Sequence, residues 1–119
     1  MDPRVAWTVD QMQRQMADSL PLAALARSVN LSVSRFAHLF RREMGISPAR
    51  HLRAIRLARA RVLLERSFLS VHDVMRLVGY HDPSHFARDF RRVHGTSPMS
   101  LRGASMMNSR QPSMTATRR

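Results

Sequence analysis

The chain has 119 residues, of which 20 are basic and 8 acidic, so its formal net charge is +12. This length predicts one domain with a core of modest size, and the charge favours a polyanionic partner, nucleic acid before an anionic membrane. Cysteine is absent, which excludes disulfides, thiolate catalysis and cysteine-based zinc fingers.

Helix start and stop signals divide the sequence into seven predicted helices. Each start carries a capping residue, a proline or both, and most ends coincide with Gly or Asn. The starts are Asp2-Pro3, Pro21, Ser32, Ser47-Pro48, Ser70 with Asp73 as a capping box, Asp82-Pro83 and Ser97-Pro98. The ends are expected near residue 18, at Asn30, at Gly45, near Arg66, at Gly79 and at Gly95. No stretch alternates with period two, so no sheet is predicted.

The segment from Gly103 onward has no hydrophobic periodicity and is rich in Ser, Met, Thr and Arg. It is predicted to be a disordered basic tail over 103–119, following a folded domain over 1–102. His94, near the end of the sixth helix, is expected to be a helix C-terminal cation or a solvated side chain.

A repeat at an offset of fifty residues is the strongest pattern in the sequence. Eight positions recur by identity: Phe36, Ala37, Phe40, Arg41, Arg42, Gly45, Ser47 and Pro48 match Phe86, Ala87, Phe90, Arg91, Arg92, Gly95, Ser97 and Pro98. The repeat indicates two helix-turn-helix modules, at about 20–46 and 70–96, joined by a long helix over about 48–66. On a strongly basic chain, two such modules point to duplex DNA.

A helical wheel separates two faces on each repeated helix. The phenylalanines Phe36, Phe40, Phe86 and Phe90 lie on one face and are expected in the core, as are Met12, Met16 and Met44 on their own stripes. The opposite face carries small residues followed by long basic ones, which suits an approach to a groove floor. The first repeated helix is poor in long donors before His38, so the second module is expected to contribute more direct readout.

The joining helix suggests how both modules engage one duplex. Its length of about 19 residues corresponds to roughly 28 Å, and adjacent major-groove segments on one face of B-DNA lie roughly 34 Å apart. The sequence therefore predicts two recognition helices in adjacent major-groove segments.

Residues from about 20 to 102 resemble the DNA-binding domain of AraC/XylS-type transcriptional regulators. The resemblance rests on Leu22-x-x-Leu25-Ala26, on Phe40-Arg41-Arg42-x-x-Gly45-x-Ser47-Pro48 and on Arg56-Leu57-x-Arg59-Ala60-Arg61-x-Leu63-Leu64. It also rests on Val78-Gly79-Tyr80-x-Asp82-Pro83-Ser84-His85-Phe86 with Phe90-Arg91-Arg92-x-x-Gly95-x-Ser97-Pro98. It implies an all-α fold of seven helices, two helix-turn-helix modules and promoter binding that usually activates transcription. Met75 departs from it, because the family usually has a small residue there.

The candidate DNA-contacting residues follow from the wheel and from the resemblance. The expected base-reading residues are Ser34, Ala37, His38, Ser84, His85 and Arg88. The expected phosphate contacts are Arg41, Arg42, Arg50, Arg53, Arg91 and Arg92. His85 and Asp89 are expected to form an i,i+4 pair on the helix surface.

Other kinds of site find little support in the sequence. His81 and His85 have a helical ligand spacing, but no third ligand is placed, so no metal site is predicted. No motif orients a serine against a histidine and a carboxylate, and neither an enzyme activity nor a cofactor is expected. No small-molecule effector is expected on this chain.

The expected function is that of a sequence-specific duplex-DNA-binding transcription regulator, acting as an activator at promoters, with RNA polymerase as a further partner. The alternatives are an architectural DNA-binding protein with little sequence preference and an interaction domain that holds protein. No apolar run approaches the roughly 18 residues that span a bilayer, and no signal peptide is visible. A cytoplasmic, nucleoid-associated protein is therefore expected.

Overall fold

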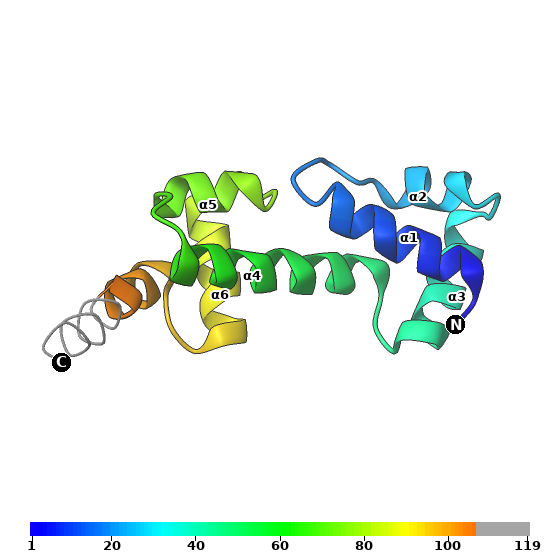
Figure 1. Cartoon of the computed structure of the whole chain (residues 1–119). Helices are drawn as coiled ribbons and strands as arrows, with labels where there is room; N and C mark the ends of the chain where they lie inside the picture. Colours follow the sequence, from blue (N-terminus) through cyan, green and yellow to red (C-terminus); the bar gives the residue numbers. More distant parts are fainter. Residues whose placement is uncertain (107–119) are drawn as a thin grey trace, which may run out of the picture. The chain divides into compact units, whose positions relative to one another are not determined.

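The computed structural model describes residues 1–106, and every regular element among them is a helix (Figure 1). The helices are α1 (Pro3–Arg14), α2 (Leu22–Ser28), α3 (Val33–Met44), α4 (Pro48–Arg66), α5 (Val71–Leu77) and α6 (Pro83–His94), followed by a helical segment over 98–106. The predicted all-α fold with two helix-turn-helix modules is confirmed. In this described part of the chain, no helix has both the length and the apolar character needed to cross a membrane.

Two compact units make up the chain, Met1–Arg56 and Leu57–Arg119, and the boundary between them falls inside α4. The first unit contains α1, α2, α3 and the first part of α4. The second contains the rest of α4 with α5, α6 and the helical segment over 98–106. Each helix-turn-helix module therefore lies within one unit.

The core of the first unit forms where α1 and α2 pack on α3. Its buried residues are Val5, Met12, Leu25, Ala26, Phe36, Leu39, Phe40 and Leu52, with Met16 and Met44 partly buried against them. The rings of Phe36 and Phe40 meet edge to face, with centroids 5.8 Å apart. The predicted core positions of these phenylalanines and methionines are confirmed.

The core of the second unit, like that of the first, contains two phenylalanines of its recognition helix, and it also contains the buried aromatic residue Tyr80. Its buried side chains are Leu57, Ala60, Leu64, Val74, Met75, Val78, Tyr80, Phe86 and Phe90. Phe86 contacts both Tyr80 and Phe90, with ring centroids 5.2 and 5.7 Å away. Met75 is buried at the position that corresponds to Ala26, so the second core accommodates the larger side chain.

The caps predicted for the two recognition helices are present. Ser32 Oγ accepts a hydrogen bond from the Arg35 amide at 3.1 Å, and Asp82 Oδ1 accepts from the amides of Ser84 and His85. Gly45 and Gly95 end α3 and α6 in the left-handed region, with φ of 82° and 76°. A residue with a Cβ is strained at such a φ, which explains glycine at both positions.

The turns inside the two modules share one motif but differ in length. After α2, the Leu31 amide donates to the Ala26 carbonyl while Asn30 has a φ of 60°. After α5, the Tyr80 amide donates to the Met75 carbonyl while Gly79 has a φ of 95°. Both are Schellman endings. The second turn then has one more residue before the cap of the next helix, so α2 and α5 match at an offset of 49, not 50.

The first helix ends earlier than its apolar pattern predicts, at Arg14 and not near residue 18. Arg56, on α4, donates from Nε to the Met16 carbonyl and from Nη2 to the Asp18 carbonyl, both at 2.9 Å. These bonds satisfy two carbonyls of the segment that follows α1 and tie that segment to α4.

The predicted start of the disordered tail at residue 103 is wrong for residues 103–106, which are helical. Arg102 Nε donates to the Leu64 carbonyl and Ser105 Oγ donates to the Glu65 carbonyl, each at 2.9 Å. These bonds satisfy carbonyls at the C-terminal end of α4, and thereby hold the segment against that helix. The remainder of the predicted tail, 107–119, lies outside the described residues.

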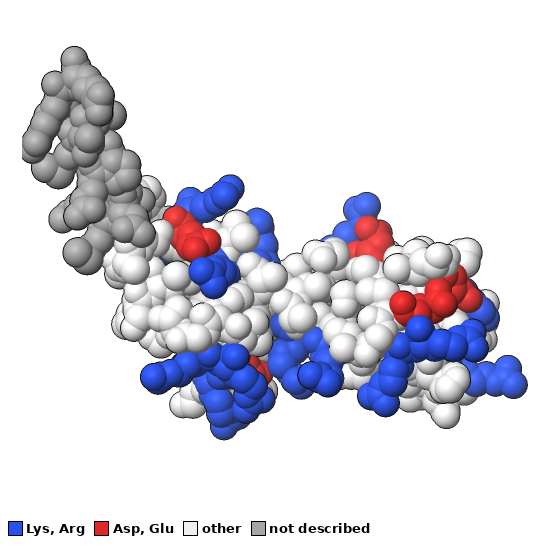
Figure 2. Space-filling model, turned by 90° about the horizontal axis from the view of Figure 1, so that it is seen from below, with Lys and Arg blue, Asp and Glu red and all other residues white. Residues whose placement is uncertain are grey.

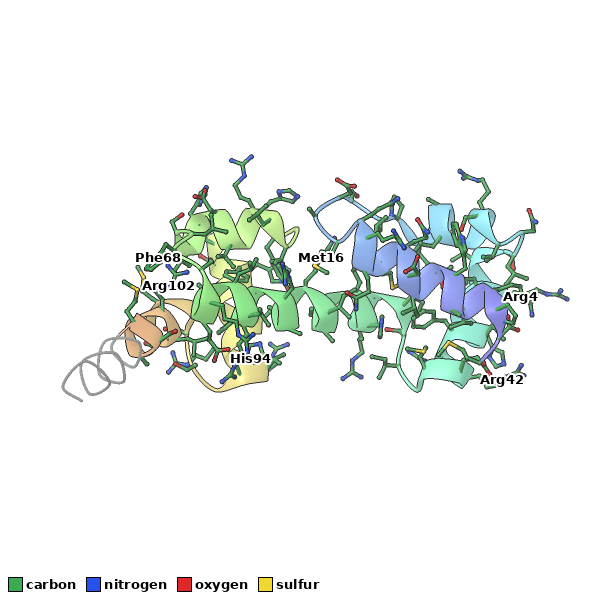
Figure 3. All side chains as sticks on the ribbon, in the orientation of Figure 1. Arg4, Met16, Arg42, Phe68, His94 and Arg102 are labelled. Carbon is green, nitrogen blue, oxygen red and sulfur yellow. The ribbon has the colours of Figure 1, made fainter. Side chains whose placement is uncertain are left out.

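His94 lies in the last turn of α6 (Figure 3) and is half-buried, so the expectation of a solvated side chain is wrong. The alternative, a cation at the helix C-terminus, stays a prediction. The Nε2 of His94 lies 3.0 Å from the Leu57 carbonyl, its Nδ1 lies 3.4 Å from Arg61 Nη1, and its ring centroid is 4.4 Å from that of Phe90. If Arg61 donates to Nδ1, then Nε2 carries the hydrogen and donates the bond to the Leu57 carbonyl. The side chain therefore joins the end of α6 to α4 within the second unit.

Candidate nucleic-acid interface

The repeat in the sequence is reproduced in the burial of the side chains. Each residue from 32 to 50 is buried, half-buried or exposed in the same way as the residue fifty positions later. This agreement covers the recognition helices α3 and α6 and the helix start that follows each of them. Both modules therefore present the same pattern of positions to solvent.

In the first module, α3 exposes two of the three predicted base-reading residues. Ser34 and His38 are exposed, whereas Ala37 is half-buried beside them. A cleft of about 530 Å³ brings Ser34 and His38 together with Arg42. Its lining residues are Arg4, Leu31, Ser34, Arg35, His38, Leu39 and Arg42. A predicted phosphate contact thus lies beside two predicted base-reading residues.

Two basic residues that line this cleft, Arg4 and Arg35, are not among the DNA contacts predicted from the sequence. Arg35 is exposed on α3 and adds a long basic side chain before His38, on the same side of the helix as Arg42. The repeat itself offered the signal, because Arg35 lies fifty residues before His85. Arg4, on α1, gave no such signal, because that helix lies outside both the repeat and the family resemblance.

Arg4 is held in place by the residue that caps its helix. Its Nε donates to Asp2 Oδ1 at 3.1 Å and its Nη2 donates to Asp2 Oδ2 at 2.8 Å. Hydrogen bonds from Arg4 lower the pKa of Asp2 to about 2, and the carboxylate raises the pKa of Arg4. Both groups are therefore charged at neutral pH.

In the second module, α6 exposes Ser84, His85 and Arg88. The predicted pair forms, with His85 Nε2 3.3 Å from Asp89 Oδ2, but its expected place on the helix surface is wrong for Asp89, which is buried. The His85 ring also meets Tyr80 edge to face, with centroids 5.6 Å apart. His85 is thus oriented by two neighbours, whereas Arg88 extends from the helix one turn beyond Ser84.

The six arginines predicted to contact phosphate are all exposed. They are Arg41 and Arg42 on α3, Arg50 and Arg53 on the first part of α4, and Arg91 and Arg92 on α6. In the face seen in Figure 2, arginine is the predominant charged residue on each unit, and acidic side chains form only small patches. Such a surface attracts a phosphate backbone.

In the described part of the chain, no three side chains among His, Asp and Glu come together as potential metal ligands. His94 makes two polar contacts, to Arg61 and to the Leu57 carbonyl, and both lie within the second unit.

Comparison with known proteins places this arrangement in a family. The family model of a helix-turn-helix domain matches residues 25–104. The arabinose operon regulatory protein of Salmonella typhimurium is 36% identical over 86% of this chain and 37% of its own length. The transcriptional activator RhaS of Escherichia coli O139:H28 is 34% identical over 82% of this chain and 34% of its own length. The chain thus spans about a third of the curated relatives that it matches.

Solved structures give the same result. The DNA-binding domain of AdpA, in complex with a target DNA, is 29% identical and covers 92% of this chain and 96% of its own, with a TM-score of 0.83. The C-terminal domain of AraT, a response regulator from Geobacillus stearothermophilus, is 28% identical and covers 87% and 86%, with a TM-score of 0.82. The chain belongs to the AraC-type helix-turn-helix family of DNA-binding transcription regulators.

Proposed function

We propose that this chain is the DNA-binding part of a sequence-specific transcription regulator that reads duplex DNA with α3 and α6. The observation that carries the proposal is the duplicated exposed face, on which small residues precede long basic ones in both modules. Small residues let a helix backbone approach the base edges closely, and basic residues further along meet the phosphates. The solved AdpA domain, which holds a target DNA, supports duplex DNA as the ligand.

The proposed base-reading residues are Ser34, Ala37 and His38 in the first module and Ser84, His85 and Arg88 in the second. Arg88 supplies a planar pair of donors for a guanine edge, and His38 supplies a ring nitrogen. Since His85 also pairs with Asp89, we assign it a smaller share of the readout than Arg88.

The six exposed arginines are proposed to bind the phosphate backbone and to supply most of the affinity. Each such contact releases condensed counterions, so the affinity should fall steeply with salt. Two recognition helices on one chain are proposed to occupy adjacent major-groove segments, which gives a bipartite site.

Activation is proposed because curated relatives are named as an operon regulator and as a transcriptional activator. This role requires RNA polymerase as a second partner at the promoter, and a location at the nucleoid. An in vitro transcription assay with the selected site placed upstream of a promoter tests it. Transcription that rises with the protein supports activation, and transcription that falls supports repression.

The experiment that tests sequence-specific binding is selection from random duplex DNA, followed by sequencing of the retained fraction. Two short motifs about one helical turn apart are expected. The same selection with Arg88→Ala should keep the first motif and weaken the second, whereas Arg14→Ala, on α1, should keep both. Retention without any motif would instead support an architectural protein, and no retention would support a protein-binding domain.

A further inference from the structure

The cleft beside α3 combines basic residues from two helices of the first unit. Three arginines and one histidine line it, Arg35, His38 and Arg42 from α3 and Arg4 from α1. Figure 3 shows Arg4 and Arg42 at the same end of this unit. The basic residues of the cleft favour the binding of an anion.

Two carboxylates near this cleft are already engaged with the protein. Asp2 binds the Nε and Nη2 edge of Arg4, and Glu43 Oε1 accepts a hydrogen bond from the Asp2 amide at 2.6 Å. Neither carboxylate is among the lining residues. They anchor the start of α1 to the end of α3 and leave the arginines to define the charge of the cleft.

The ion pair with Asp2 also sets the geometry of Arg4. A guanidinium bound along one edge by a carboxylate keeps its remaining N–H groups in a fixed plane. A second acceptor can bind the Nη1 side without displacing Asp2. Less side-chain entropy is then lost on binding than for a mobile arginine.

The position of the cleft identifies the anion. Ser34 and His38 belong both to the cleft and to the proposed base-reading face, while Arg42 and Arg35 lie roughly 80–100° further round α3 than Ser34 and roughly 40–60° further than His38. The cleft therefore runs along one edge of that face. When a recognition helix occupies a major groove, the groups along its edges are the phosphates of the bordering strand.

From this geometry, and on the basis of the proposed function, we infer that the cleft binds a backbone phosphate bordering the first module's site and that Arg4 contacts it. The helix α1, which lies outside the residues matched by the family model, is then part of the DNA interface. Arg35 contributes to the same contact from the α3 side of the cleft.

The test compares Arg4→Gln with Arg14→Gln in the full chain. Both remove one charge from α1, but Arg14 is paired with Asp10 four residues away and does not line the cleft. Thermal melting followed by circular dichroism verifies that both variants are folded. The slope of log affinity against log salt should become shallower by roughly 0.9 for Arg4→Gln, as for the loss of one phosphate contact, and should stay at the wild-type value for Arg14→Gln.

A scan with methylphosphonate linkages, each of which removes the charge of one phosphate, then locates the contact. One position bordering the first motif should weaken binding by the wild type and by Arg14→Gln more than it weakens binding by Arg4→Gln, in which Arg35 still faces the same phosphate. If Arg4→Gln keeps the wild-type salt slope and the wild-type phosphate profile, the inference is overturned. Selection of a motif by the wild-type chain is measured separately. If the wild type selects no motif, the proposed function is overturned. If the wild type selects a motif but Arg4→Gln and Arg14→Gln have the same salt slope and phosphate profile, only the role of Arg4 is overturned.

Discussion

The hydroxyl of Tyr80 donates a hydrogen bond of 2.9 Å to Oδ2 of Asp89 in the interior of the second unit. The two residues are only 7% and 5% exposed. Tyr80 lies in the turn before α6 and Asp89 lies within α6, so the bond fixes the recognition helix to its own turn. The same carboxylate oxygen meets His85, which links this buried contact to the proposed reading face.

Replacement of Tyr80 by Phe is expected to lower the free energy of unfolding by about 1–3 kcal/mol, because a buried carboxylate loses a donor while the ring packing remains. Urea denaturation measures the change. In an Asp89→Ala background the same replacement should cost much less. An equal cost in both backgrounds would show that the hydroxyl acts elsewhere.

Truncation of the central phenylalanines should destabilise each unit. Phe40→Ala and Phe90→Ala are each expected to cost about 3–5 kcal/mol, as fully buried aromatic residues do. Phe68→Ala is the matched control, because the Phe68 side chain is 90% exposed and its loss should change little. Thermal and urea unfolding of the three variants test this, and similar melting temperatures for all three would contradict the assigned core.

Arg88→Ala tests direct readout by the second module. We expect a loss of about 1–3 kcal/mol on the selected sequence and a relaxed preference at one base position, since a bidentate contact to a base edge disappears. Fluorescence anisotropy on the selected site and on its single-base variants measures both effects. Arg92→Ala provides the comparison, with uniform weakening on all sequences. A uniform loss for Arg88→Ala would reassign this residue to the phosphates.

The stability of the first unit should depend on the protonation of His51. Burial lowers the pKa of this histidine below its ordinary value of 6.5, and its Nε2 is buried without a hydrogen-bond partner in the described structure. The unfolded chain then binds the proton more tightly than the folded one. The first unit therefore has its full stability above pH 6.5. Its free energy of unfolding declines as the pH falls from 6.5 toward the lowered pKa of His51 in the folded state.

His51→Leu should reduce this decline, because it removes the titrating group from an apolar contact with Phe40. Melting temperatures at pH 7.5 and 5.5 for the wild type and for His51→Leu measure it. The control His81→Leu removes an exposed histidine and should retain the wild-type decline. If the melting temperature falls by the same amount between pH 7.5 and 5.5 in both variants, His51 is not the source of the decline.

Prediction from the sequence succeeded where the signal is local or repeated. Ser32, Gly45, Asp82 and Gly95 define the recognition helices because caps and left-handed turn residues act within a few positions of the chain. The spacing of the phenylalanines fixed the inner face of both helices. The candidate DNA-contacting residues remain predictions, although the structure exposes all of them except the half-buried Ala37.

The sequence by itself determined the pair of helix-turn-helix modules, their caps and their basic outer faces, because each depends on residues within a single helix or in the turns beside it. Tertiary structure decided the contacts between distant segments. Arg56 binds the Met16 and Asp18 carbonyls in the segment after α1, Arg102 and Ser105 hold the last described helix against α4, and Arg4 comes to lie beside α3. Such pairs are about forty residues apart along the chain, and no local propensity or spacing encodes them.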